Sequence, residues 1–68
     1  NVKVLNNNGS YTITSSQCDF SVFDMTGRLL FESFNKESLF LSNTDFSSGL
    51  YNVILHNGKD SKMVQIVF

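Results

Sequence analysis

The sequence predicts an all-β fold, a small antiparallel β-sandwich of about seven short strands. Apolar and polar residues alternate with a period of two through much of the chain, as they do in strands that bury one face. Turn-forming residues separate the alternating runs at intervals of about 8–12 residues, which is typical of sandwiches. No stretch repeats apolar residues at helical spacing, and Ala is absent from the 68 residues. We therefore expect essentially no helix.

Seven runs give the expected strands. They lie near residues 2–5, 10–15, 19–25, 29–34, 37–42, 49–56 and 61–68. The alternating apolar residues of the clearest runs are Tyr11 and Ile13; Cys18, Phe20 and Val22; Leu39 and Leu41; Tyr51, Val53 and Leu55; and Val64, Ile66 and Phe68. Each set occupies every second position, so its side chains share one face of a strand.

Turn-forming residues lie between these runs. A polar stretch at 6–9 separates the first two strands, and a hairpin turn at 25–28 contains Gly27, which can take a positive φ angle. A polar loop at 43–48 leads into the sixth strand. Asn57-Gly58 is the strongest short hairpin signal in the chain.

The last hairpin permits two registers. A two-residue turn at Asn57-Gly58 pairs Tyr51 with Val64, whereas a longer loop of four residues pairs Tyr51 with Ile66 and Val53 with Val64. In either register the apolar pattern resists a slip of one residue, because a slip would turn half of these side chains outward. The opposite face carries Leu50, Ile54, Met63 and Val67. We expect partial cover or a docking surface on that face.

Length and charge limit the classes of function. The chain is long enough for one domain, residues 1–68, which we expect to have been cut from a longer protein. The net charge is −1, and five scattered cations do not form the basic cluster that nucleic acids require. A single Cys excludes an internal disulfide and a Cys-based zinc site. No apolar run approaches the roughly 18 residues of a membrane span.

Catalytic chemistry is not predicted. His56 is the only His and lies next to a hairpin turn, and no G-x-S-x-G motif is present. Asp19 and Asp24 are five residues apart in one strand, so they point to opposite faces. Cys18 has the same parity as its apolar neighbours, and we expect it to be a small buried residue. We expect no enzyme activity, no small-molecule substrate, no cofactor and no metal.

Phenylalanines are the other residues that could form a ligand site. The ones that could line a sugar-binding platform are Phe23, Phe31, Phe34, Phe40 and Phe46. Carbohydrate-binding platforms usually contain Trp or Tyr, and the chain has no Trp. We therefore expect these rings to pack inside the sandwich.

The order of motifs resembles a known family. Residues 20–30, FSVFDMTGRLL, resemble alternating apolar residues followed by Asp-x-x-Gly-Arg/Lys and two apolar residues. Residues 46–53 resemble apolar-x-x-Gly-apolar-Tyr-x-apolar, and an Asn-Gly-Lys hairpin and a Lys-plus-apolar strand at 62–68 follow. Together they are similar to the type A C-terminal sorting domain of the type IX secretion system, the Por secretion tail. The usual Pro-Asn-Pro turn differs, since residues 6–8 are all Asn, and the loop at 42–46 is one residue longer.

The resemblance implies a fold, a function and a location. Such domains are seven-stranded, immunoglobulin-like sandwiches at the C-terminus of cargo proteins in Gram-negative bacteria. They fold in the periplasm, and the outer-membrane secretion machinery recognises them and carries the cargo to the cell surface or the extracellular space. A sortase-like peptidase typically removes the domain and links the cargo to surface lipopolysaccharide. The domain is then a substrate and not an enzyme.

The resemblance also suggests which residues are recognised. The last strand can offer an unpaired edge, which a partner or a second copy of the chain could extend. The residues expected in recognition are Arg28, Lys62, Val64, Ile66, Val67 and Phe68. The motif residues expected to serve the fold are Asp24, Gly27, Gly49 and Tyr51.

One alternative has the same sandwich pattern. An extracellular immunoglobulin-like binding or spacer module, for example one associated with carbohydrate, would also show low charge and short alternating strands. The absence of Trp argues against carbohydrate binding.

Overall fold

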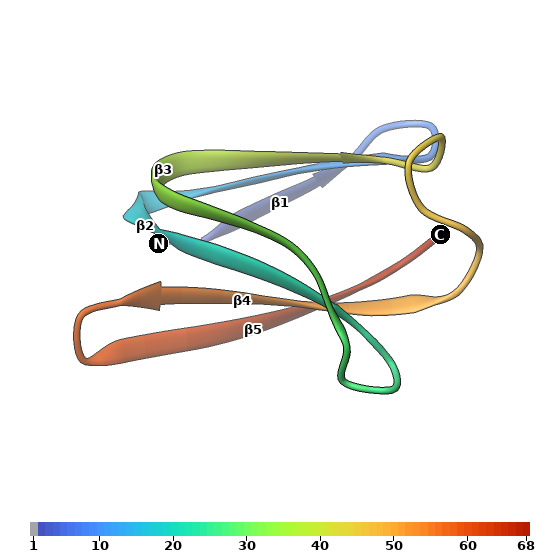
Figure 1. The fold of residues 1–68 in the computed structure, drawn as a ribbon. Coiled ribbons are helices and arrows are strands. Elements are labelled where there is room, and N and C mark those ends of the chain that lie inside the picture. The colour runs from blue at the N-terminus through green and yellow to red at the C-terminus, as the bar shows by residue number, and fades with distance from the viewer. Residues whose placement is uncertain (1) are drawn as a thin grey trace.

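The computed structural model describes residues 2–68 as one antiparallel sheet of five strands, with no helix in that range. Asn1, the first residue of the expected domain, lies outside the described residues. The strands are β1 (Lys3–Asn6), β2 (Ser10–Asp24), β3 (Leu29–Ser42), β4 (Leu50–Asn57) and β5 (Asp60–Val67). The sheet curls into a half-barrel, so β1 and β5 lie in different layers (Figure 1). The prediction of an all-β antiparallel fold is confirmed.

The predicted number of strands is wrong, because two strands each span two of the expected ones. β2 covers the runs at 10–15 and 19–25, and β3 covers those at 29–34 and 37–42. The register between β2 and β3 shifts on both sides of Cys18, and Asn35 of β3 has a φ angle of +60°. Bulges of this kind bend a strand without ending it. The polar residues between the expected strands are therefore bends and not loops.

The bends let β2 belong to both layers of the half-barrel. Its first half pairs with β1 and β3, and its second half pairs with β3 and β4. β5 continues the sheet beyond β4. β1, β3 and β5 each pair on one side only and are the edge strands of the described sheet.

The core lies in the concave side of the curled sheet. Its buried residues are Tyr11, Ile13, Cys18, Phe20, Val22, Leu39, Leu41, Tyr51, Val53, Leu55 and Ile66. Val64 and Phe68 are partly buried against this cluster. Every alternating apolar residue identified from the sequence thus faces the core, which confirms the strand parity. None of the described residues belongs to a helix long and apolar enough to cross a membrane.

The prediction that the Phe rings lie inside is wrong for three of them. Phe31, Phe34 and Phe40 are 45%, 61% and 66% exposed, and Phe23 and Phe46 are half-buried. All three exposed rings lie on β3, an edge strand. Phe40 lies between the buried Leu39 and Leu41, so alternation turns its side chain away from the core, and apolar composition alone did not predict burial there.

The last hairpin adopts the second of the two expected registers. Tyr51 pairs with Ile66 and Val53 with Val64, but the loop has two residues, Gly58 and Lys59, and not the four expected for this register. Gly58 has a φ angle of +59°, which suits the first central position of a type II′ turn. The alternative with Asn57-Gly58 as the central pair is wrong by one position.

Candidate functional site

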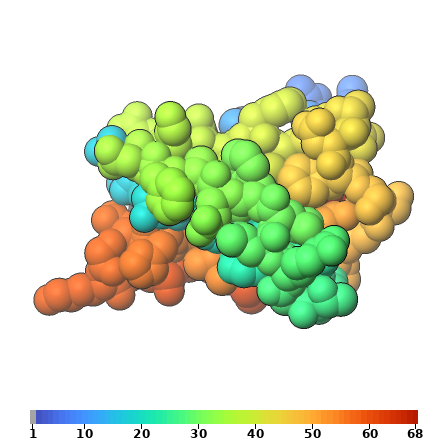
Figure 2. All heavy atoms as spheres, viewed as in Figure 1, coloured from blue at the N-terminus to red at the C-terminus, as the bar shows by residue number. Residues whose placement is uncertain are grey.

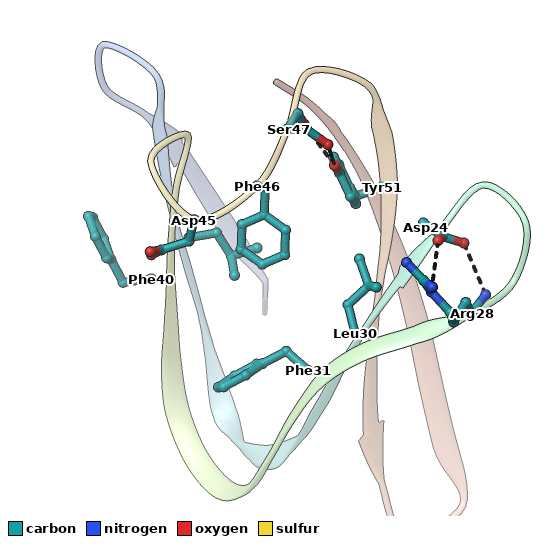
Figure 3. Close-up of a pocket in the computed structure, with 10 residues that line it drawn as sticks. Asp24, Arg28, Leu30, Phe31, Phe40, Asp45, Phe46, Ser47 and Tyr51 are labelled. Atoms are coloured by element: carbon teal, nitrogen blue, oxygen red, sulfur yellow. Dashed lines mark hydrogen bonds and ion pairs between the residues drawn. The ribbon is translucent and has the colours of Figure 1, made fainter.

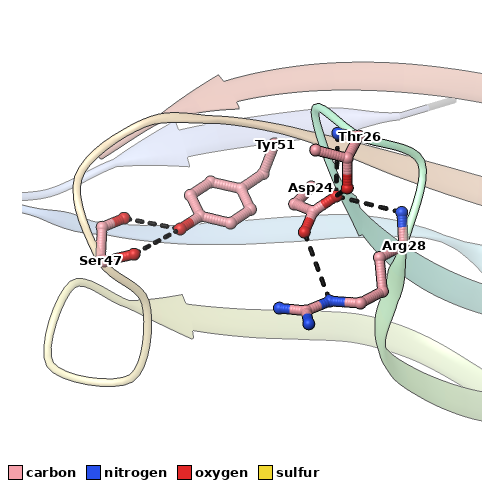
Figure 4. Close-up of polar contacts among 5 residues, drawn as sticks. All are labelled: Asp24, Thr26, Arg28, Ser47 and Tyr51. Carbon is pink, nitrogen blue, oxygen red and sulfur yellow. Dashed lines mark hydrogen bonds and ion pairs between the residues drawn. The ribbon is translucent and has the colours of Figure 1, made fainter.

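The Asp-x-Thr-Gly-Arg motif forms a turn that is fixed by one carboxylate. Asp24 Oδ1 accepts hydrogen bonds from the Thr26 amide at 2.9 Å, the Thr26 hydroxyl at 2.6 Å and the Arg28 amide at 3.0 Å (Figure 4). The Gly27 amide donates to the Asp24 carbonyl, and Gly27 has a φ angle of +88°. A three-residue hairpin loop needs a left-handed residue at this position, which explains the glycine.

The same contacts hold Asp24 in its charged form. The Thr26 hydroxyl contributes most to lowering the pKa of the Asp24 carboxyl, the Arg28 amide contributes next, and the Arg28 guanidinium adds a small effect. The carboxylate therefore has its partners within the turn. It is poorly placed to act as a general base.

Arg28 presents a cation at the surface beside this turn. Its Nε lies 3.5 Å from Asp24 Oδ2, and its side chain is 75% exposed. Within residues 2–68 no other hydrogen bond or ion pair of the guanidinium is found. An exposed pair with a single contact stabilises little, so the outer end of Arg28 is available to a partner.

An open cavity of about 650 Å³ lies next to Arg28, between β3 and the loop at 43–48 (Figure 3). Its apolar walls come from Leu30, Phe31, Phe40, Leu41 and Phe46, and its polar lining from Asp24, Arg28, Asp45, Ser47 and Tyr51. Figure 2 shows this face of the molecule, with β3 in green and the loop in yellow. Neither His56 nor Cys18 lines the cavity, and the Ser47 hydroxyl in its lining lies 3.2 Å from the Tyr51 hydroxyl.

The Gly-x-Tyr motif, residues 49–51, holds Phe68 in place. The Gly49 amide donates to the Phe68 carbonyl at 3.0 Å, and the Phe68 amide donates to the Gly49 carbonyl at 2.9 Å. The Phe68 ring stacks on Phe46 and meets Tyr11 and Tyr51 edge to face, with centroids 5.4–5.8 Å apart. The Tyr51 hydroxyl donates to the Ser47 carbonyl at 2.7 Å (Figure 4). Gly49 and Tyr51 thus hold the last residue against the core.

Tyr11 holds the last strand from the other side. Its hydroxyl donates to the Val67 carbonyl at 2.8 Å and accepts from the Val67 amide at 3.3 Å. The alternation of apolar and polar residues predicted an inward face for Tyr11 but not this contact with Val67. The available signal was the hydroxyl itself, because a buried Tyr hydroxyl usually finds a hydrogen-bond partner.

The structure separates the residues expected in recognition into two groups. Arg28, Lys62 and Val67 are exposed, and Arg28 and Lys62 line different cavities. Ile66 is only 2% exposed. Its side chain therefore cannot be contacted while the strand is in place. Val64 and Phe68 are half-buried against the core.

The remaining candidates for chemistry are a buried thiol, Cys18, and an exposed imidazole, His56, which lies opposite Asp19 on β2. Cys18 is buried, and burial raises the pKa of its thiol. A hydrogen bond from Ser15 opposes this effect, and the charge of Asp19 adds to it. His56 is exposed and pairs with Ser61 across β4 and β5. Residues 2–68 contain no group of three or more His, Cys, Asp or Glu residues that could hold a metal ion.

In this small β-fold the motif residues stabilise a turn and hold Phe68 against the core. These are the features of a recognition module. The family model for the secretion system C-terminal sorting domain matches residues 1–68, the whole chain. The chain therefore belongs to this family, the Por secretion tail, and is a C-terminal sorting signal of the type IX secretion system. No curated protein matches the chain.

Family membership establishes the general function. The type IX secretion machinery recognises the domain, and the signal directs export across the outer membrane to the cell surface or the extracellular space. The family consists of sorting signals and is not a family of enzymes. The match supports sorting, and it does not support the alternative of a binding or spacer module.

Proposed function

We propose that this domain crosses the periplasm as a folded module at the C-terminal end of its cargo and is recognised there through β5. A sortase-like peptidase then removes the domain, and the cargo is attached to the cell surface. The fold is a five-strand form of the immunoglobulin-like sandwich. Because β2 and β3 each contribute to both layers, their four halves, together with β1, β4 and β5, supply the seven segments of that architecture.

The observation that supports recognition through β5 is the regularity of this edge strand. β5 pairs with β4 from Leu50–Val67 to Asn57–Asp60 without a register shift. β3 is also an edge strand, but its register against β2 is broken in three places. β1 is only four residues long. A regular edge of eight residues is the one best suited to accept an added strand.

The six residues expected in recognition then have different roles. The side chains of Lys62 and Val67 contact the partner directly, and Arg28 contributes a charge at the separate turn beside the cavity. Ile66 and Phe68 act by holding β5 in its place on the core, and the half-buried Val64 both packs against the core and contacts the partner. This assignment is supported by the exposure of the first three and the burial of Ile66.

The test is an export assay. Residues 1–68 are fused behind a periplasmic reporter in a host that has the type IX system, and reporter on the cell surface is measured. We expect surface reporter with the intact domain and none when residues 61–68 are removed. A reporter without the domain, which should remain in the periplasm, is the control. Equal export with and without residues 61–68 would contradict recognition through β5.

A further inference from the structure

The hydrogen bonds at the chain end define which backbone groups of β5 point away from β4. Phe68 exchanges both of its backbone hydrogen bonds with Gly49, so these two residues form a hydrogen-bonded pair. In an antiparallel ladder, hydrogen-bonded pairs alternate with pairs whose backbone groups point outward. The even-numbered residues of β5 therefore bond to β4, and the odd-numbered residues point outward. The contacts of Val67 with the Tyr11 hydroxyl agree, because they lie on the outer side.

The free part of the edge is consequently short and well defined. The outward-pointing residues are Ser61, Met63, Gln65 and Val67. Tyr11 occupies both backbone groups of Val67. Within residues 2–68 no strand lies beyond β5, and no hydrogen bond from outside the β4–β5 ladder reaches the backbone of the other three. They offer three amides and three carbonyls in a row.

Lys62 and Val64 lie between these outward-pointing residues, and their side chains indicate which residue types the partner strand carries. Lys62 is exposed, and the single ion pair within residues 2–68 is that of Arg28 with Asp24. Val64 is half-buried at the margin of the core. On an added antiparallel strand, residues opposite Lys62 and Val64 would form non-hydrogen-bonded pairs, in which side chains approach most closely. An acidic residue is favoured opposite Lys62 and an apolar residue opposite Val64.

We propose that the partner is an extended segment of another protein that pairs antiparallel with β5 along residues 61–65. It carries the sequence apolar-x-acidic, with the apolar residue opposite Val64 and the acidic residue opposite Lys62. The Tyr11 hydroxyl ends the backbone pairing before Val67, so the partner contacts Val67 only through its exposed side chain. The proposal rests on the proposed function, since it specifies the partner of the same edge.

A second copy of the chain is a poorer occupant. Two copies of β5 paired about Met63 would place Lys62 opposite Val64 of the second copy, without a countercharge. Pairing about Ser61 would match Lys62 with Asp60 of the second copy, but Val64 would then face Gly58 in the turn. Neither pairing gives Lys62 an acidic partner and Val64 an apolar partner at the same time, so the edge of β5 favours a segment of another protein.

The first experiment removes one outward amide. Met63→Pro deletes an amide that does not bond to β4, a position where an edge strand tolerates Pro. Met63→Thr is the matched control, because it changes the side chain and keeps the amide. Circular dichroism must show that both variants melt cooperatively. We expect Met63→Pro to reduce export to the level seen without residues 61–68, and Met63→Thr to be exported like the unmodified domain.

The second experiment tests the partner sequence directly. The ¹⁵N-labelled chain is titrated with synthetic heptapeptides of alternating Thr that contain Val-x-Glu, Glu-x-Val or Val-x-Lys at the centre. We expect Val-x-Glu to bind best and to slow amide exchange at Ser61, Met63 and Gln65, while Val67 is unchanged. In the Tyr11→Phe variant, the bound Val-x-Glu peptide should also slow amide exchange at Val67.

The outcomes separate the two proposals. If the intact domain does not export the reporter, the proposed function fails. If it does and Met63→Pro is exported equally well, only the inference about the β5 edge fails. Tighter binding of Glu-x-Val or Val-x-Lys, or a dimer that protects the same amides without peptide, would also overturn this inference.

Discussion

At the residue scale, single polar side chains in this domain each serve several backbone groups. One oxygen of Asp24 accepts from two amides and a hydroxyl, and the Tyr11 hydroxyl serves both backbone groups of Val67. Hydrogen bonds to a charged acceptor are stronger than neutral ones. The turn at Asp24 therefore depends on its charge, whereas the contact at Tyr11 depends on its geometry.

The charge at Asp24 predicts a dependence of stability on pH. Because folding lowers the pKa of its carboxyl, the contribution of Asp24 is fully present above the ordinary value of about 4 and is lost as the pH falls toward the lower folded value. Asp24→Asn keeps an acceptor without the charge. We expect the thermal midpoints of the natural chain and Asp24→Asn to differ at pH 7 and to converge at low pH. A constant difference across this range would show that the charge is not responsible.

Tyr11→Phe tests the contact with the last strand. Removing the hydroxyl leaves two partly buried backbone groups of Val67 without their partner, and we expect a loss of roughly 1–3 kcal/mol in the free energy of unfolding. Urea denaturation measures the loss, and faster amide exchange at Val67 locates it. Tyr51→Phe is a matched comparison that should leave exchange at Val67 unchanged. Unchanged exchange at Val67 in Tyr11→Phe would contradict the hydrogen bond.

Tyr51→Ala tests the contribution of the ring itself. Tyr51 is buried and contacts Phe46 and Phe68 edge to face, so truncation should cost roughly 3–5 kcal/mol and largely unfold so small a domain. Phe34→Ala removes an equally large but exposed ring and should change stability by less than about 0.5 kcal/mol. Thermal melts of both variants give the comparison. Equal midpoints would show that the ring of Tyr51 is not part of the core.

At the element scale, the domain contrasts two bent strands with one regular strand. β2 and β3 shift register where they pass from one layer to the other, whereas β5 pairs with β4 without a shift. In β3 the bend is fixed at Asn35, whose amide donates to Asp19 Oδ1 at 2.9 Å. Bulges on an edge strand oppose pairing with other chains. The regular edge of β5 is therefore where added strands are favoured.

The bend at Asn35 predicts an unusual order of substitutions. Its φ angle of +60° is readily adopted by Gly and Asn, and other residues pay roughly 1–2 kcal/mol there. We expect Asn35→Ala to lower the free energy of unfolding by about this amount and Asn35→Gly to have little effect. Urea denaturation of the two variants checks the order. A more stable Ala variant would show that the bend does not require this conformation.

Alternation predicted the core well and the strand ends poorly, for physical reasons. Parity is a local property, so the inward positions of Phe20 and Val53 follow from their neighbours alone. A polar residue that bends a strand, such as Asn35, has the same composition as one that ends it. The difference lies in whether the neighbouring strand continues, which sequence alone does not reveal.

The candidate site was predictable to a similar extent. Exposure of Arg28 and Lys62 follows from their charge. The inward position of Ile66 was already implied by the alternation of the last strand. The contact of Tyr11 with Val67 joins residues 56 positions apart, and the cavity brings the first residues of β3 close to the loop that follows its last residue. Such long-range contacts depend on the curl of the sheet and leave no local pattern.

At the scale of the whole molecule, apolar side chains remain exposed along β3. Leu29, Leu30, Phe31, Phe34 and Phe40 are each at least 37% exposed. A monomer rarely exposes a large contiguous apolar patch unless it serves an interaction. The irregular backbone of β3 opposes strand addition, so a partner on this side would contact side chains and not the backbone.

The way the final residue is held has a consequence for quality control during secretion. Phe68 is anchored by Gly49 and by the aromatic rings around it, and its neighbour Val67 is anchored by Tyr11. These anchors come from segments far apart in the chain, so they converge only after the whole domain has folded. A receptor that binds the ordered edge of β5 would therefore not bind an unfolded or damaged molecule of the same sequence. Export would then depend on the tertiary structure of the domain, and a cargo protein with a misfolded domain would not be exported.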